Sequence, residues 1–150
     1  MARQPRTRTV LTALCRLPRP GGPAMLTVRQ LLDAKPPGLI TVEAENPVRA
    51  AIQLMAQHHI GALPVLRGPE LTGIISERDY ARKVVLLGRN SAETPVWQIM
   101  STPVLTVGPG DSVEHCMRLM TERRIRHLPV LDEGVLVGMV SIGDCVRAII

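Results

Sequence analysis

The hydrophobic and polar positions of this chain follow a pattern that predicts a strand, a helix, a β-hairpin and a second helix. Residues 39–42 form a short apolar segment that we expect to be extended. Apolar residues then recur at helical spacing over residues 48–55, which is typical of a helix that buries one face. Two apolar runs at 62–66 and 71–76, joined by a polar turn, predict a hairpin. The second helix is expected directly after Ser76.

The same pattern occurs again 65 residues further along the chain. Residues 41–85 and 106–150 align without a gap, and 15 of their 45 positions are identical. Because a repeat decides the architecture, we expect an α/β (α+β) fold in which the order β-α-β-β-α is given twice. The two repeats are expected to pack with pseudo-twofold symmetry. Pro64 and Pro129 cannot donate a hydrogen bond to a ladder, so we expect an edge strand at each of these points.

Shifts in composition along the chain predict its division into repeats. Residues 25–86 are assigned to the first repeat, 87–95 to a polar linker and 96–150 to the second repeat. The segments 28–32 and 96–100 are similar to each other. Each is expected to form a turn of helix that leads into the repeat that follows it.

Capping residues indicate where the first helix of each repeat begins and ends. Asn46 and Asp111 are expected to be N-caps, with Pro47 at the first helical position, where its missing N–H costs nothing. The helical patterns end near His59 and Arg124.

Composition and charge argue against a nucleic-acid partner. Trp97 and Tyr80 are the only aromatic residues, so aromatic platforms for stacking bases are scarce. The formal net charge is +5, and five arginines without any acidic residue lie in residues 1–24. Residues 25–150 are therefore neutral and provide no general footprint for a polyanion.

Residues 1–24 form a leader that is rich in Arg and Pro. We expect a disordered extension, or a mis-called start with Met25 as the working one, and a targeting peptide stays open as an alternative. Pro18, Pro20 and Pro23 argue against the targeting peptide because they break an amphipathic helix. No apolar run approaches the roughly 18 residues of a membrane span. We therefore expect a soluble, cytoplasmic protein without a membrane partner.

The residues that usually carry metal or catalytic chemistry do not form a recognisable set. Cys15, Cys116 and Cys145 form no C-x-x-C pair, so neither a disulfide framework nor a zinc site is indicated. Cys116 lies on the apolar side of a helical pattern and is expected to be a buried thiol. His58 and His59 would point about 100° apart on a helix, and a third ligand is lacking. We expect no metal site, no catalytic residue and no enzymatic activity.

The motifs T-V, N/D-x-V, I-x-x-L-P-V and L-x-G-x-x-S-x-x-D occur in this order in both repeats. Together they resemble the cystathionine-β-synthase (CBS) domain, and two in tandem resemble a Bateman module over residues 26–150. The phrases GIISERDYARKV, IRHLPV and GMVSIGD look most like small stand-alone CBS-pair proteins. The resemblance implies an adenine nucleotide ligand such as AMP, ATP or NAD, with S-adenosylmethionine also open. It also implies a homodimer of CBS pairs and a regulated protein whose identity is unknown.

The S-x-x-D units Ser76…Asp79 and Ser141…Asp144 are the chief candidates for ligand binding. From spacing alone they are typical of a helix-capping arrangement. The resemblance instead implies that each Asp accepts both ribose hydroxyls while the Ser faces a phosphate near a helix N-terminus.

The resemblance further implies two sites in the clefts between the repeats, each with residues from both. The adenine edge would be recognised by backbone groups near Val42 and Val107, with Ile60 or Ile125 beside the ring. One site would join Ser76 and Asp79 with Asp111, Ile125, Arg126 and His127, and the other would join Ser141 and Asp144 with Asn46, Ala51, Ile60 and Gly61.

The repeats differ at positions that bear on phosphate binding. Arg78, Arg126 and His127 could gather around phosphates at the Asp79 site, and guanidinium groups bind phosphate as a bidentate fork. For Arg126, surface exposure is an equally good interpretation. We hypothesise two unequal sites, with the Asp79 site binding the more highly phosphorylated nucleotide. A regulatory nucleotide-sensing module is the first functional hypothesis, and a structural, dimerising interaction module with vestigial ligand sites is the alternative.

Overall fold

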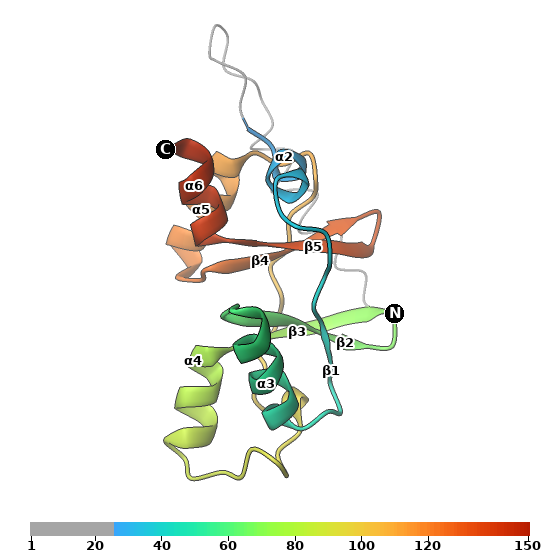
Figure 1. Cartoon of the computed structure of the whole chain (residues 1–150), viewed down its shortest axis with the longest axis vertical. Helices are drawn as coiled ribbons and strands as arrows, with labels where there is room; N and C mark the ends of the chain where they lie inside the picture. The colour runs from blue at the N-terminus through green and yellow to red at the C-terminus, as the bar shows by residue number, and fades with distance from the viewer. Residues whose placement is uncertain (1–25) are drawn as a thin grey trace, which may run out of the picture. The chain divides into compact units, whose positions relative to one another are not determined.

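The computed structural model describes residues 26–150 (Figure 1). The expected leader and Cys15 lie outside the described residues. The chain divides into two compact units. The Asp79 unit comprises Ile40–Val104, and the Asp144 unit combines residues 26–39 with Leu105–Ile150. Both mix helices with a small sheet, so the predicted α/β class is confirmed.

The Asp79 unit follows the predicted order of elements. Its sheet has the strand order β1-β2-β3, with β1 parallel to β2 and β2 antiparallel to β3. Helices α3 and α4 lie on the same side of this sheet (Figure 1). The elements are β1 (Val42–Glu43), α3 (Val48–His58), β2 (Ala62–Arg67), β3 (Glu70–Ser76), α4 (Glu77–Tyr80), the π-helical turn η1 (Ala81–Val85) and the 3₁₀ turn η2 (Val96–Gln98).

The Asp144 unit repeats this arrangement, with its first strand reduced to a single bridge. Val107 pairs in parallel with Val130, at the position that β1 occupies in the other unit. Strands β4 and β5 form an antiparallel hairpin, and α2, α5 and α6 lie on one side of it (Figure 1). The elements are α2 (Val28–Asp33), α5 (Val113–Arg123), β4 (His127–Asp132), β5 (Val135–Ser141) and α6 (Ile142–Ile149).

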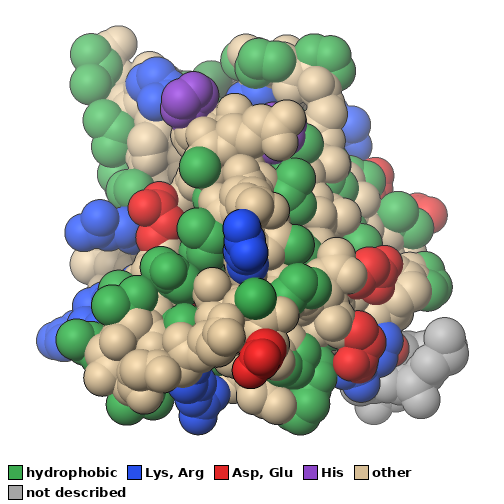
Figure 2. All heavy atoms as spheres, turned by 60° about the horizontal axis from the view of Figure 1, so that its bottom comes forward, with side chains coloured by type: hydrophobic (Ala, Val, Ile, Leu, Met, Phe, Trp, Pro, Cys, Tyr) green, Lys and Arg blue, Asp and Glu red, His purple; other side chains and the backbone are tan. Residues whose placement is uncertain are grey.

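Each unit has its own hydrophobic core, built from the helical face and the strand residues that the periodicity predicts. In the Asp79 unit, Val48 and Ala51 of α3 pack with Leu63 of β2, and all three are fully buried. In the Asp144 unit, Cys116 of α5 and Leu128 of β4 are buried in the same way. The predicted burial of the Cys116 thiol is therefore confirmed. On the face drawn in Figure 2, basic and acidic side chains are interspersed among hydrophobic ones.

The lead-in segments are exchanged between the repeats. The predicted turns of helix form, but α2 leads into the aligned stretch 41–85 and packs instead in the core formed by residues of the second repeat. Conversely, η2 leads into the aligned stretch 106–150 and packs in the core formed by residues of the first repeat. Equivalent backbone hydrogen bonds hold both, from the Val28 N–H to the Asp111 carbonyl and from the Val96 N–H to the Asn46 carbonyl, each 2.8 Å long.

A glycine in each hairpin provides the space for this exchanged segment. A Cβ atom on Gly73 would lie 2.6 Å from the Met100 sulfur, and one on Gly138 would lie 2.7 Å from Leu32 Cδ2. Real Cβ atoms do not approach other atoms so closely. The two glycines occupy equivalent positions in the two repeats. They thus allow the exchanged lead-in segments to pack closely on β3 and β5.

The predicted N-caps of α3 and α5 are wrong by one residue. Pro47 and Ser112 occupy the N-cap positions with extended backbone, and the Ser112 hydroxyl accepts the His115 N–H at 3.0 Å. Asp111 is instead buried, and its carboxylate accepts the Gly108 N–H at 2.6 Å. A short polar side chain that accepts a hydrogen bond can cap a turn as well as a helix, and the sequence pattern does not show which of these it caps.

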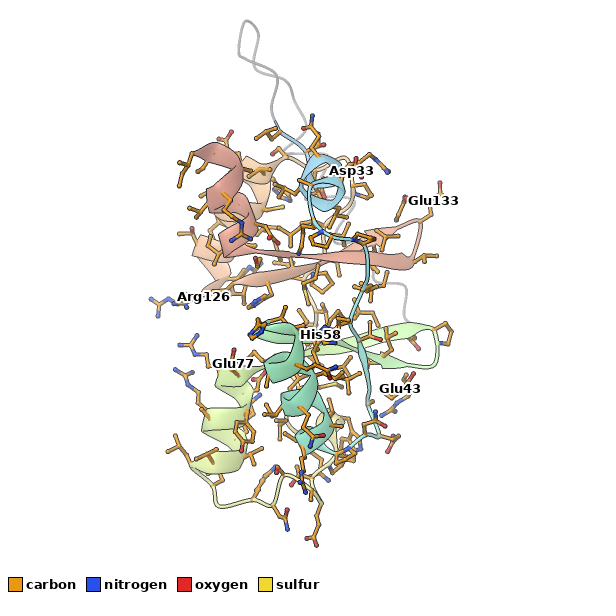
Figure 3. All side chains as sticks on the ribbon, viewed as in Figure 1. Asp33, Glu43, His58, Glu77, Arg126 and Glu133 are labelled. Atoms are coloured by element: carbon orange, nitrogen blue, oxygen red, sulfur yellow. The ribbon has the colours of Figure 1, made fainter. Side chains whose placement is uncertain are left out.

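The predicted C-terminal ends of these helices are confirmed. His59 and Arg124 are the C-caps, both with left-handed backbone, at φ values of 54° and 53°. The β4–β5 turn also has left-handed residues, Glu133 at its tip and Gly134, which is the geometry of a two-residue hairpin loop (Figure 3).

The prediction that Pro64 and Pro129 lie on edge strands is wrong. Strand β2, which contains Pro64, is the central strand of its sheet. The reason is visible at Pro129, whose carbonyl accepts the Val107 N–H at 3.1 Å, while the Leu131 N–H donates to the Val107 carbonyl at 2.9 Å. The parallel pairing uses the proline only as an acceptor, so its missing N–H breaks no hydrogen bond there.

Candidate ligand-binding site

In the Asp79 unit, the S-x-x-D motif forms a closed polar cluster at the junction of β3 and α4. The Ser76 hydroxyl accepts the Asp79 N–H at 3.1 Å, and Asp79 Oδ2 accepts the Ser76 N–H at 3.0 Å. The other carboxylate oxygen, Oδ1, accepts from the Ser101 hydroxyl at 2.9 Å and lies 3.1 Å from the Lys83 ammonium. Asp79 is buried, and both of its oxygens have partners.

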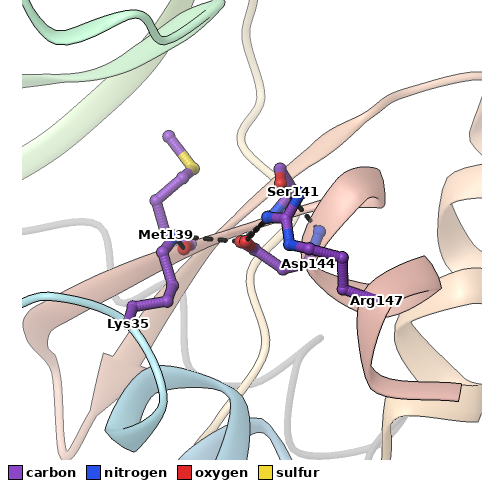
Figure 4. A network of polar contacts seen from close by, with 5 residues as sticks. All are labelled: Lys35, Met139, Ser141, Asp144 and Arg147. Carbon is purple, nitrogen blue, oxygen red and sulfur yellow. Dashed lines mark hydrogen bonds and ion pairs between the residues drawn. The ribbon is translucent and has the colours of Figure 1, made fainter. Parts of the chain in front are cut away.

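The Asp144 unit has the same cluster at the junction of β5 and α6 (Figure 4). The Ser141 N–H donates to Asp144 Oδ2 at 2.9 Å, and the Asp144 N–H donates back to the Ser141 hydroxyl at 3.1 Å. The Lys35 ammonium donates to the same Oδ2 at 2.9 Å. Arg147, one turn along α6, donates to Oδ1 at 2.7 Å. These lengths are typical of charge-assisted hydrogen bonds.

The surroundings of Asp144 favour its charged form. Burial acts to raise the pKa of this carboxyl, but the hydrogen bonds from Lys35 and from the Ser141 backbone outweigh burial and lower the pKa. For the nearby His127, the surroundings favour the neutral form instead. Burial lowers the pKa of the His127 imidazole; the Asp144 charge opposes this effect, while the charges of Lys35 and Arg126 add to it. His127 is therefore mostly neutral at physiological pH and can act there as a hydrogen-bonding group.

The start of the I-x-x-L-P-V motif lies beside the S-x-x-D motif of the same unit. The Glu77 N–H donates to the Gly61 carbonyl at 3.0 Å, and the Ile142 N–H donates to the Arg126 carbonyl at 2.9 Å. Arg126 itself is exposed and extends away from its hairpin (Figure 3). The predicted groupings, which combine residues of both repeats, stay predictions.

The remaining predicted site residues differ in how accessible their side chains are. Arg78 and Asn46 are exposed, whereas Ile60, Gly61, Ile125 and His127 are half-buried. Ala51, Val42 and Val107 belong to the hydrophobic cores, and Asp111 is also buried. The N–H and the carbonyl of Val107 are both paired with β4, so Val107 contributes to its unit chiefly as a sheet residue.

The family model of the CBS domain matches residues 25–86 and 96–150. This chain belongs to the CBS domain family. The predicted resemblance is confirmed, and the CBS pair extends over nearly all the described residues.

Three known proteins illustrate this relationship. The mitochondrial CBS domain-containing protein CBSX3 of Arabidopsis thaliana is 46% identical over 111 residues, which cover 71% of this chain and 54% of that protein. The chain thus spans about half the length of this relative. A solved structure of a protein with CBS domains from Burkholderia ambifaria is 52% identical, with a TM-score of 0.80, and the match covers 83% of this chain and 93% of that one.

A third relative was solved with ligands. The CBS domain pair of protein MJ0100, in complex with 5′-methylthioadenosine and S-adenosyl-L-methionine, is 27% identical to this chain, with a TM-score of 0.73. The match covers 84% of this chain and 97% of that one. The CBS pair of MJ0100 thus holds two adenosine derivatives.

Three polar residues that contact the S-x-x-D clusters were not predicted from the sequence. The contact of Lys83 could have been predicted, because Lys83 follows Asp79 by four residues on a helical face, a spacing typical of ion pairs. Ser101 and Lys35 reach their aspartates from the exchanged lead-in segments and their flanks, 22 and 109 positions away in the sequence. Local spacing carries no information about such contacts. Among residues 26–150, no group of three or more His, Cys, Asp or Glu could hold a metal ion.

Proposed function

We propose that this protein is a regulatory CBS-pair module that binds an adenosine-containing ligand through the S-x-x-D clusters of its two units. One observation carries the proposal. In both units a buried, hydrogen-bonded carboxylate and a serine hydroxyl lie together at the start of a helix. The complex of MJ0100 with two adenosine derivatives supports this class of ligand.

The chemistry of the cluster suits a ribose. An ionised carboxylate has two oxygens that only accept, so it can receive both hydroxyls of a vicinal diol at once. The serine hydroxyl lies where backbone N–H groups at the helix start favour a negatively charged group. A ligand diol would take the place of donors that now contact the carboxylate, such as the Ser101 hydroxyl at Asp79.

We further propose that the two sites are unequal, with the Asp79 site binding the more highly phosphorylated nucleotide. The exposed Arg78 is the second residue of α4, whereas Gly143 occupies the equivalent position of α6. The contacts of the carboxylates also differ. Asp144 is held by two charge-assisted hydrogen bonds, from Lys35 and Arg147, while Asp79 has one lysine and a neutral hydroxyl. A neutral donor is the easier one to replace.

Isothermal titration calorimetry with AMP, ATP, NAD and S-adenosylmethionine tests this function. The variants Asp79→Asn and Asp144→Asn preserve the size of each side chain while removing the charged acceptor, and each should abolish one binding step. Asp132→Asn, which changes an exposed carboxylate at the end of β4, is the matched control and should bind like the native protein. Absence of binding by every ligand at millimolar concentration would refute the proposal.

A specific observation favours a second candidate, a structural module that acts through dimerisation or contact with a partner. Val85, Leu86 and Leu87, where η1 ends, are 56%, 76% and 62% exposed, and a partner or second copy would bury them. Oligomeric state follows from sedimentation of the native protein and of the variant Leu86→Glu. If the native chain is dimeric, the variant monomeric and neither binds a nucleotide, the second candidate replaces the first.

A further inference from the structure

Lys35 contacts the candidate ligand carboxylate from a distant part of the chain. Its ammonium donates to the Met139 carbonyl at 2.8 Å and to Asp144 Oδ2 at 2.9 Å (Figure 4). The Asp144 side chain is only 5% exposed, whereas that of Lys35 is 37% exposed. A partly exposed cation thus covers one oxygen of a buried carboxylate.

Lys35 also belongs to the stretch of chain that joins the two units. Residues 26–39 belong to the Asp144 unit, and the Asp79 unit begins at Ile40. On one side, Lys35 is anchored by α2, because its own N–H donates to the Leu32 carbonyl at 3.2 Å. On the other side, residues 36–39 are exposed. The ion pair therefore lies where α2 gives way to the connector, residues 34–39.

In the Asp79 unit, the lysine that contacts the aspartate comes from a different part of the fold. Lys83 is in the helical turn that continues α4, four residues after Asp79, and it binds the Ile99 carbonyl as well. Its position is fixed by the same helix that carries the aspartate. A ligand that displaced the Lys83 ammonium from Asp79 would move only a side chain. A ligand that displaced the Lys35 ammonium from Asp144 would remove a contact that anchors the connector.

We propose that Lys35 gates the Asp144 site: a ligand diol that binds Asp144 displaces the ammonium and releases the connector between the two units. The gate rests on the proposed function, because it requires a ligand at Asp144. It also assigns a regulatory consequence to that site, since occupancy changes the restraint on the connector. A ligand shifts such an equilibrium only as far as it binds the two states differently.

The direction in which one substitution changes the ligand affinity distinguishes a gate from an ordinary ligand contact. If Lys35 competes with the ligand, Lys35→Met removes the competitor and tightens binding. If the ammonium instead binds a ligand phosphate, the same substitution weakens binding. Lys35→Arg keeps the charge and should stay near the native affinity. Arg29→Met removes one positive charge from the same segment, where Arg29 and Asp132 form an exposed pair, and serves as the matched control.

The experiment measures AMP binding by calorimetry in the Asp79→Asn background, in which only the Asp144 site binds. We expect Lys35→Met to bind about tenfold more tightly, the factor that corresponds to losing one charge-assisted competitor of roughly 1.4 kcal/mol. Arg29→Met should leave the affinity unchanged. In parallel, hydrogen exchange of the Lys35 amide should speed up on adding AMP to the protein with native Lys35.

The outcomes distinguish the gate from the proposed function. Equal or weaker binding by Lys35→Met overturns the gate while leaving ligand binding intact. Unchanged exchange at the Lys35 amide on ligand addition overturns the gate as well. Absence of AMP, ATP, NAD and S-adenosylmethionine binding in the native protein overturns the proposed function, and the gate with it. A ligand-free thermal unfolding curve of Lys35→Met shows that the variant is folded before it is titrated.

Discussion

The close approach of the exchanged segments to Gly73 and Gly138 leads to a quantitative prediction. Both glycines lie in strands without a positive φ, so alanine fits their backbone and its effect is steric. In Gly73→Ala the new methyl would lie 2.6 Å from the Met100 sulfur and 3.2 Å from the Ser101 carbonyl oxygen. The sulfur is in a flexible side chain, but the carbonyl belongs to a backbone bridge in which Ile74 and Ser101 exchange hydrogen bonds.

Gly138→Ala is the matched case in the other unit. Its methyl would meet only the Leu32 side chain among the nearest contacts, at 2.7 Å, 3.0 Å and 3.4 Å. A leucine side chain can change rotamer, so we expect a loss of about 1 kcal/mol in the free energy of unfolding. We expect about 2–3 kcal/mol for Gly73→Ala, near the upper range for overpacking, because backbone must move.

Urea denaturation measures both losses. With a slope of about 2 kcal/mol/M, the midpoint should fall by roughly 0.5 M for Gly138→Ala and by 1 M or more for Gly73→Ala. A double-mutant cycle with Leu32→Ala should show coupling of about 1 kcal/mol or more, because removing Leu32 makes room for the methyl. Additive effects of Gly138→Ala and Leu32→Ala, or a Gly73→Ala midpoint equal to that of the native protein, would refute the reasoning.

Three further predictions concern single residues. His59→Gly and Arg124→Gly should each stabilise the protein by about 0.5–1 kcal/mol in urea melts, because both residues have left-handed backbone that costs a side chain roughly 1–2 kcal/mol. Burial lowers the pKa of His115. The contribution of this residue to stability is therefore complete above the unfolded pKa of about 6.5 and is lost as the pH falls through the folded pKa. His115→Leu should flatten that part of a curve of unfolding free energy against pH. Burial raises the pKa of Cys116 to about 12, so a thiol reagent at pH 8 should modify this residue only as fast as the protein unfolds.

The elements of the fold were largely predictable because their signals are local. Helical spacing and the polar positions after it located the ends at His59 and Arg124, and pairs of apolar runs joined by a polar turn located the hairpins to within a residue. The N-caps were not predictable to the residue, because Asp111 and Ser112 are both good capping residues and only the backbone decides between turn and helix. The position of Pro64 depended on which atoms the parallel partner uses, and a sequence pattern does not contain this information.

The candidate site was predictable in its identity and only partly in its environment. Ser76 with Asp79 and Ser141 with Asp144 form the expected pairs, since three-residue spacing at a strand-to-helix junction is a local property. Their further partners come from elsewhere. Lys35 lies 109 residues from Asp144, and its role depends on the exchange of lead-in segments, which the order of the repeats conceals.

The exchanged lead-in segment also restricts the order in which this chain can fold during synthesis. Val28 is completely buried against residues 105–150 of its own unit, and its hydrogen-bond partner Asp111 emerges from the ribosome roughly 80 residues later. At about 5–20 residues per second, α2 waits roughly 4–16 s for Asp111 to be synthesised. The Asp79 unit, which is contiguous in sequence, can assemble during this interval. Helix α2 is therefore synthesised well before the residues against which it packs.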